Sequence, residues 1–215
     1  MSEKIGLDPC NFCLEQEVSD SEKSLCFISS ESFFALPTLG CFVPGYSLVV
    51  PRMHIRSFAK VSDEKLIELD NFLELVRKMT EREFGPVLVA EHGTGDDEIS
   101  AACCDHAHIH IIPIKGFRQE ILEKYIRAGG TPIRLESLKA IKQYNLESYI
   151  LASFEKGEFL LWDSSKKFQR QFARIASAEC LNLGHVYNWR IHPFPNNMVI
   201  TTAKMSCTEG GHDPQ

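Results

Sequence analysis

The spacing of apolar positions changes between strand-like and helical periods along the chain. The apolar runs Leu25–Ile28 and Phe33–Leu36, separated by a serine-rich turn, predict a β-hairpin. The run Ser47–Val50, which precedes a proline, predicts a buried strand. From the candidate cap Ser62 the period becomes helical, and we expect a helix that ends near Gly85. Its apolar face consists of Leu66, Leu69, Phe72, Leu73, Val76 and Met79.

The rest of the chain predicts further strands and helices in an irregular order. Strands are expected at Pro86–Ala90 and His106–Ile112, with a polar loop that begins at Gly93 between them. Beyond Gly116 we expect a short helix at Glu120–Arg127, a hairpin of Tyr149–Phe154 with Glu158–Trp162, a helix through Phe168, Phe172, Ile175 and Ala176, and a strand at Met198–Thr202. This order favours an α+β fold.

Composition limits the class of protein. The 215 residues are 44% hydrophobic, which is enough for a packed core. A net charge of −6 gives no overall attraction to a long nucleic acid, so a bound anion must be held locally and a small phosphorylated ligand is favoured. No apolar run approaches the roughly 20 residues that span a bilayer. The N-terminus lacks the apolar core of a secretion signal, so the sequence predicts a cytoplasmic protein.

Three histidines alternate with apolar residues in the predicted strand His106–Ile112. Alternation places His106, His108 and His110 on one face, while Ala107, Ile109 and Ile111 enter the core. One imidazole in such a row can attack a phosphate while others orient it or donate hydrogen bonds. His-x-His is also a common metal-binding spacing. The spacing alone therefore leaves catalysis and metal binding open.

The flanking residues resemble the histidine-triad superfamily. The segment 106–112 agrees at every position with the signature His-φ-His-φ-His-φ-φ, in which φ is apolar. The segment 44–54 resembles the block Pro-Gly-His-x-Leu-φ-φ-Pro-Lys-x-His, with Tyr46 and Arg52 as departures. The resemblance covers about half the chain, from Cys10 to Pro113. It implies an antiparallel sheet with packed helices, usually in a homodimer, so we expect a histidine-triad domain at residues 1–116, an α+β extension at 117–205 and a disordered tail at 206–215.

The resemblance also implies nucleotide chemistry. His108 would attack the α-phosphorus and form a nucleotidyl-histidine, and His110 would donate to a phosphate oxygen. His92 stands where the family often has asparagine and is a candidate substrate-binding residue together with His110, while Ala101–Cys104 replaces the family's glutamine and serine. Relatives that transfer a nucleotide to a sugar phosphate commonly have glutamine at the third triad position. His110 therefore favours hydrolysis of a phosphoramidate, phosphosulfate or dinucleoside polyphosphate; nucleotidyl transfer and a non-catalytic nucleotide-binding adaptor are the alternatives.

Two thiols and two imidazoles form a candidate metal site. Among the eight cysteines, only Cys10 and Cys13 have the spacing of ligands. With His54 and His106 they supply a set that fits a closed, structural zinc site. The same combination recurs in zinc-bearing histidine-triad proteins and in galactose-phosphate uridylyltransferases, where the first triad histidine is a ligand. A thioredoxin-like redox pair or two ordinary cysteines are the alternatives.

The predicted extension contains a second group of basic and aromatic residues. Lys166, Lys167, Arg170 and Arg174 lie on a candidate helix, and Trp189-Arg190 follows. These side chains could contact a phosphate or stack on a base. Such charges more often form a solvated face, and nearby aromatic residues more often belong to the core.

Overall fold

A computed structural model of the protein describes residues 10, 12–13, 25–94, 106–163 and 168–206. The predicted tail after Ser206, the stretch Ala101–Cys104, and Lys166 and Lys167 lie outside the described residues.

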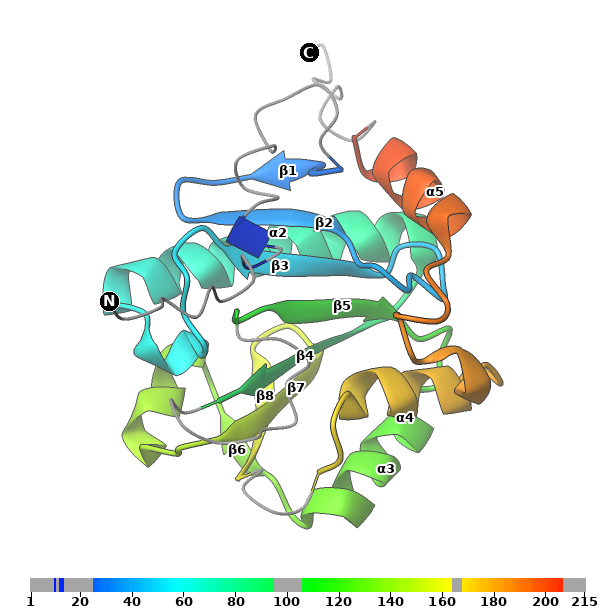
Figure 1. Ribbon diagram of the computed structural model, residues 1–215. Coiled ribbons are helices and arrows are strands. Elements are labelled where there is room, and N and C mark those ends of the chain that lie inside the picture. The colour runs from blue at the N-terminus through cyan, green and yellow to red at the C-terminus, as the bar shows by residue number, and fades with distance from the viewer. Residues whose placement is uncertain (1–9, 11, 14–24, 95–105, 164–167, 207–215) are drawn as a thin grey trace, which may run out of the picture.

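The described strands form one antiparallel sheet in the order β1-β2-β3-β5-β4-β7-β8-β6 (Figure 1). Every neighbouring pair in this sheet is antiparallel. The strands are β1 (Ile28–Ser29), β2 (Phe33–Pro37), β3 (Ser47–Pro51), β4 (Val87–Gly93), β5 (Ile109–Pro113), β6 (Ile133–Leu135), β7 (Tyr149–Glu155) and β8 (Glu158–Asp163).

Helices cover both faces of the sheet (Figure 1). They are α2 (Asp63–Phe84), α3 (Arg118–Gly129), α4 (Phe172–Cys180) and α5 (Pro195–Ser206), with the short 3-10 helices η1 (Phe58–Lys60), η2 (Leu138–Tyr144) and η3 (Gly184–Val186). One hydrophobic core packs α2, η1 and η2 against one face, and a second packs α3 and α4 against the other. The observed fold confirms the α+β class and the antiparallel sheet with packed helices.

The predicted extension continues the sheet. Strand β7 pairs with β4 over Val89–Gly93, and β8 and β6 follow it outward. Helix α4 lies over the same sheet face as the side chains of Leu88, Ala90 and Ile112. The division at residue 116 stays a prediction, but the hydrogen-bonded sheet is continuous across it.

Local patterns predicted most of the described elements. Ser62 caps α2 through its side chain, which accepts a hydrogen bond from the Lys65 backbone N–H at 3.4 Å, and the helix ends at Phe84 as expected. Strand β5 begins later than predicted, at Ile109 rather than His106. The expected alternation is nevertheless present, because Ala107, Ile109 and Ile111 all pack in the core beneath α2.

The predicted strand at Met198–Thr202 is wrong, since these residues belong to helix α5. Met198, Thr201 and Met205 are buried at a spacing of three and four residues, which is one face of a helix. The apolar Val199 is 63% exposed, so the β-branched run that suggested a strand does not line the core.

Candidate functional site

The four predicted metal ligands come together at the start of β5. The distance from Cys10 Sγ to His106 Nδ1 is 3.4 Å, and Cys13 Sγ lies 3.4 Å from His54 Nδ1 and 3.7 Å from His106 Nδ1. All four ligand atoms lie within 4.8 Å of one another. A segment near the N-terminus, the loop after β3 and the approach to β5 therefore meet at one point.

These four side chains fit a zinc ion. With Zn–S and Zn–N bonds of about 2.3 and 2.0–2.1 Å, a tetrahedral site separates its ligand atoms by about 3.3–3.8 Å, which includes the three distances above. His106 Nε2 lies 2.8 Å from the Pro51 carbonyl oxygen, so the ring donates there and directs its Nδ1 lone pair at the thiols. Burial lowers the pKa of His106 to about 4, which keeps the ring neutral as a ligand must be.

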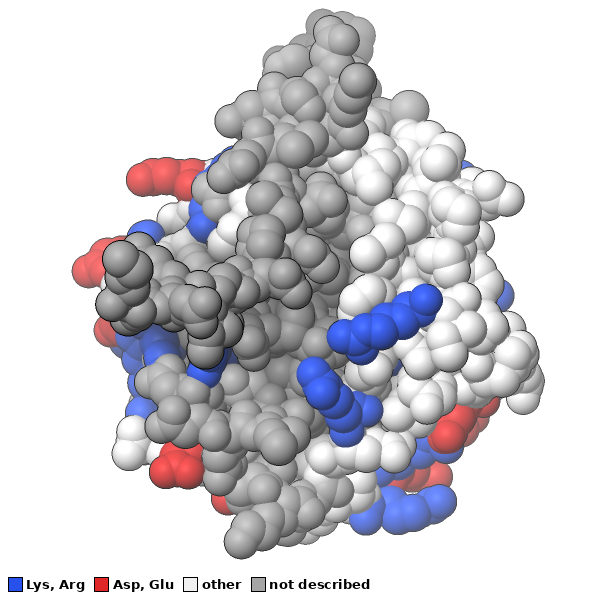
Figure 2. All heavy atoms as spheres, viewed as in Figure 1, with Lys and Arg blue, Asp and Glu red and all other residues white. Residues whose placement is uncertain are grey.

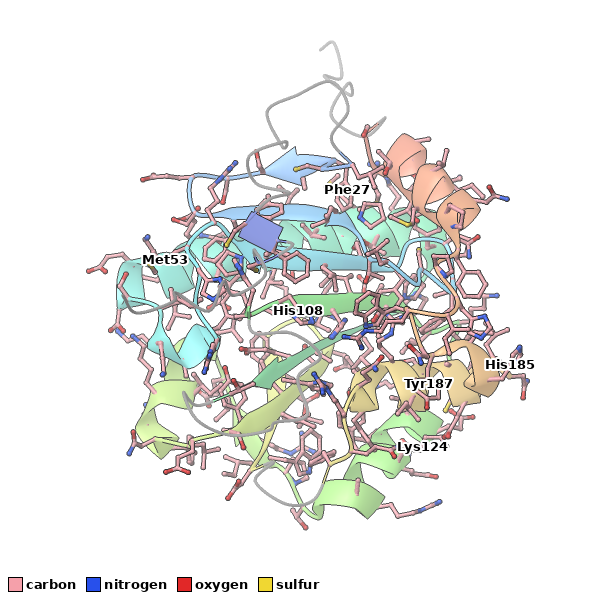
Figure 3. All side chains as sticks on the ribbon, in the orientation of Figure 1. Phe27, Met53, His108, Lys124, His185 and Tyr187 are labelled. Atoms are coloured by element: carbon pink, nitrogen blue, oxygen red, sulfur yellow. The ribbon has the colours of Figure 1, made fainter. Side chains whose placement is uncertain are left out.

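His108 is held by the backbone of the same cluster. Its Nδ1 lies 2.9 Å from the backbone oxygen of His106 and donates to it, so the lone pair of the neutral ring is on Nε2. The side chain is 5% exposed, and its ring lies 4.7 Å from the ring of His110 and 5.5 Å from that of Phe12, centroid to centroid. Figure 3 shows His108 at the start of β5, near the middle of the sheet.

A chain of hydrogen bonds links His110 to Tyr46 and, through it, to Arg174 in the predicted extension. His110 pairs in register with Leu48 and Ala90, so its side chain shares the sheet face covered by α4. Its Nδ1 lies 2.8 Å from the Tyr46 hydroxyl, which in turn accepts a 3.1 Å hydrogen bond from Arg174 Nη1 on α4. Burial, followed by the nearby His108, His92 and Arg174, lowers the pKa of His110 well below its usual value. His110 is therefore neutral.

His92 lies beside His110 on β4, with 5.9 Å between the ring centroids. Its Nε2 accepts a hydrogen bond from the Ala173 backbone N–H at the start of α4, at 3.4 Å. The neutral ring therefore has its proton on Nδ1. The structure brings His92 close to His110 and places α4 against it.

A buried carboxyl lies on the opposite face of β4. Glu91 Oε1 accepts hydrogen bonds from the Tyr149 hydroxyl at 2.7 Å and the Phe58 backbone N–H at 3.0 Å. Burial raises the pKa of Glu91 to about 7, and these two donors and the nearby His108 offset only part of that increase. A carboxyl that titrates near neutral pH therefore lies beneath the histidines.

Several residues of the site have weak or absent signals in the sequence. Phe12, whose ring contacts those of His106 and His108, lies between the two cysteines and carries no motif of its own. Tyr46 stands where the upstream block has its first histidine, and this difference from the block was its only signal in the sequence. Arg174 belongs to the predicted basic group, but it is 1% exposed rather than solvated.

The surface and helices give two further observations. On the face shown in Figure 2, two described basic side chains lie near the middle without acidic neighbours, while toward the edges Lys and Arg are mixed with Asp and Glu. None of the helices within the described residues is both long and apolar enough to cross a membrane.

Comparisons with solved structures find partial similarity to histidine-triad proteins. A HIT family protein from Bacillus anthracis is 20% identical with a TM-score of 0.41, and the match covers 50% of this chain and 74% of that one. A Zn-bound histidine triad family protein from Mycobacterium smegmatis is 16% identical with a TM-score of 0.42, and the match covers 51% and 78%.

Sequence comparisons reach farther along the chain. Zinc finger CCCH domain-containing protein 59 of Oryza sativa subsp. japonica is 23% identical over 197 residues, which is 84% of this chain and 31% of that protein. The chain thus spans about a third of the length of this relative. The family model described as "Protein similar to CwfJ C-terminal" matches residues 2–127, more than half of the 215 residues. The chain belongs to this family, whose members are described as similar to the CwfJ C-terminal region.

Proposed function

We propose that the protein is a nucleotide hydrolase that acts through a covalent nucleotidyl-histidine at His108. The observation that carries the proposal is the proton arrangement of the triad. His108 Nδ1–H donates to the His106 carbonyl and leaves the nucleophilic lone pair on Nε2, next to a neutral His110. The agreement of segment 106–112 with the histidine-triad signature supports the same assignment.

The proposed first step forms a bond between His108 Nε2 and the α-phosphorus. The bond from phosphorus to the leaving group breaks, and the leaving group departs with its electron pair. The His108 ring becomes cationic as the bond forms, and the His106 carbonyl that accepts its Nδ1–H stabilises this charge. His110 and His92 are the proposed donors to the phosphate oxygens, through the nitrogen of each ring that carries the proton.

In the second step water attacks the phosphorus, the P–N bond breaks and a proton passes to solvent. A nucleoside monophosphate leaves, and His108 returns to its neutral form. His110 and His92 would again donate hydrogen bonds to the phosphate oxygens, because charge again develops on them in this step.

The proposed zinc site would help to hold His108 in the orientation that the reaction needs. Cys10, Cys13, His54 and His106 would hold the ion, and four protein ligands leave no position for water. The ion would tie the N-terminal segment to the sheet and fix the His106 backbone, whose carbonyl orients His108. The chemical step uses side chains of the protein alone.

The test is a turnover assay with nucleoside phosphoramidates, dinucleoside polyphosphates and nucleotide sugars. We expect hydrolysis of at least one class, and a loss of several orders of magnitude in His108→Ala. His185→Ala, a change at an exposed histidine on η3, is the control and should react like the wild type. Turnover that depends on added phosphate or sugar phosphate would indicate a transferase. Nucleotide binding without turnover of any class would indicate an adaptor.

The homodimer and the cytoplasmic location stay predictions from the sequence. Sedimentation velocity at several concentrations tests the first, and fractionation of cells that express the tagged chain tests the second. Neither result bears on the role of His108.

A further inference from the structure

Arg174, which comes from α4 in the predicted extension, is a large charged side chain that is only 1% exposed. Its Nε donates to the Tyr187 carbonyl at 2.9 Å, and its Nη2 donates to the Gly40 carbonyl at 2.6 Å. Its Nη1 donates to the Tyr46 hydroxyl at 3.1 Å and to the Leu39 carbonyl at 3.4 Å. Residues 39–46 and the segment after α4 therefore surround the guanidinium, and Figure 3 shows Tyr187 near the end of α4.

The acceptors of these four hydrogen bonds are neutral oxygens. The guanidinium also lies over the rings of Tyr46 and Phe42, at 5.0 and 5.5 Å from their centroids. Burying a charge against neutral groups costs several kcal/mol. Burial of the Arg174 charge therefore destabilises the fold unless another interaction offsets it. The Tyr46 hydroxyl links this guanidinium to His110, the third triad histidine.

The position of the guanidinium sets the direction of the hydrogen bonds. Arg174 can only donate, so the Tyr46 oxygen accepts from it. A phenol that accepts from a cation becomes a stronger donor, and its O–H then points at His110 Nδ1, 2.8 Å away. A neutral imidazole that accepts at Nδ1 has its proton on Nε2. The chain of donors thus runs from Arg174 through Tyr46 to His110.

We propose that Arg174 and Tyr46 are positioning residues that hold His110 as the neutral tautomer with its proton on Nε2. This nitrogen then acts as a fixed donor for an anionic oxygen, and the buried cation supplies a favourable field for that anion. The use of the donor by a phosphate rests on the proposed function; the tautomer does not. The predicted extension thereby completes a site that the first half of the chain contains only in part.

The backbone at Gly40 lies so close to the Arg174 guanidinium that it leaves no room for a side chain at this position. Gly40 has a φ of 72°, and a Cβ there would collide with the Arg174 guanidinium and with Trp189. Its backbone N–H donates to the Pro193 carbonyl at 3.0 Å, in the segment between α4 and α5. The loop before β3 therefore closes on both Arg174 and the chain that follows α4.

Nitrogen-15 NMR of the imidazoles tests the tautomer directly, with His110 assigned by the loss of its signals in His110→Gln. We expect an unprotonated Nδ1 and a protonated Nε2 in the wild type. Tyr46→Phe should shift His110 Nδ1 and produce a mixture of tautomers. Tyr125→Phe is the matched control, because Tyr125 is a buried tyrosine of the same core whose hydroxyl has no hydrogen-bond partner within the described residues. This control should leave the His110 signals unchanged.

Arg174→Met and Arg174→Lys separate the charge from the geometry. Arg174→Met should move the His110 signals in the same direction as Tyr46→Phe, and Arg174→Lys should restore part of the difference. Where Arg174→Met does not fold, Tyr46→Phe decides the result. A wild-type proton on Nδ1, or His110 signals that stay the same in Tyr46→Phe, would overturn the proposal.

Turnover gives a second readout if a substrate class is found. Tyr46→Phe should lower kcat by about 10- to 100-fold with a smaller change in KM, while Tyr125→Phe should not change either constant. A wild-type kcat in Tyr46→Phe would overturn the role of the relay. A protein without turnover would refute the proposed function and leave the NMR result to decide the tautomer.

Discussion

Replacing Glu91 with glutamine measures how much the ionisation of this buried carboxyl, which lies beneath the triad, destabilises the folded protein. Glutamine keeps the oxygen that accepts from Tyr149 and Phe58 but cannot ionise. Burial raises the pKa of Glu91 from 4.5 to about 7, which corresponds to about 3 kcal/mol between the two protonation states. This magnitude applies to a side chain that is 1% exposed, where solvent screening is small.

The sign follows from proton linkage. Below pH 4.5 the carboxyl is protonated in both the folded and the unfolded protein, so it contributes no penalty. Between pH 4.5 and about 7 the unfolded chain ionises first, and the penalty on the folded state grows with pH. Glu91→Gln should therefore gain about 3 kcal/mol in unfolding free energy relative to wild type on going from pH 4.5 to pH 8.

Urea unfolding of both proteins at several pH values measures this difference, and titrations that the two proteins share cancel from it. Glu31→Gln, a change at an exposed glutamate between β1 and β2, is the control for the loss of an acidic side chain at the surface. A flat difference for Glu91→Gln, or a wild type that gains relative stability as the pH rises, would refute this reasoning.

Three further predictions concern metal and packing. Metal analysis of untagged protein should give about one zinc per chain, and Cys10→Ser with Cys13→Ser should abolish binding and lower the melting temperature; a wild type that is purified without zinc, together with a double variant that melts like wild type, would contradict the site. Tyr125→Phe should leave stability unchanged or raise it by about 1 kcal/mol, seen as a rise of about 2–4 °C in Tm, because its hydroxyl lacks a partner among the described residues; a clear loss would refute this. Gly40→Ala should destabilise the protein by more than 1 kcal/mol in urea unfolding, because its φ is 72° and its Cβ would meet Arg174; a neutral result would contradict the described loop.

Local sequence patterns were sufficient for the elements that carry their own caps and period. Helix α2 followed from a serine cap and an apolar stripe, and the strands around it followed from short apolar runs between turn residues. Helix α5 did not follow, because Val199-Ile200-Thr201-Thr202 is rich in β-branched residues. Met198 and Met205 pack against the two cores, and Thr201 Oγ1 accepts a hydrogen bond from the Gly45 backbone N–H; these contacts lie outside the segment.

The residues of the candidate site also differ in whether the sequence alone could identify them. Its histidines and cysteines lie in short motifs, so their identity could be read from the sequence and the ligand cluster could be predicted. Arg174 is separated from Tyr46 by 128 positions, and no local signal distinguishes this buried arginine from the exposed Arg170 that precedes α4. Its role depends on where the extension packs, which only the tertiary structure describes.

Intact mass spectrometry after rapid alkaline quenching tests the central proposal most directly. Wild-type protein mixed with adenosine phosphoramidate should gain the mass of one adenylyl group, and His185→Ala should gain it as well. His108→Ala should show neither the adduct nor turnover. Turnover by His108→Ala at the wild-type rate, or an adduct that still forms in His108→Ala, would contradict the assignment of His108 as the nucleophile.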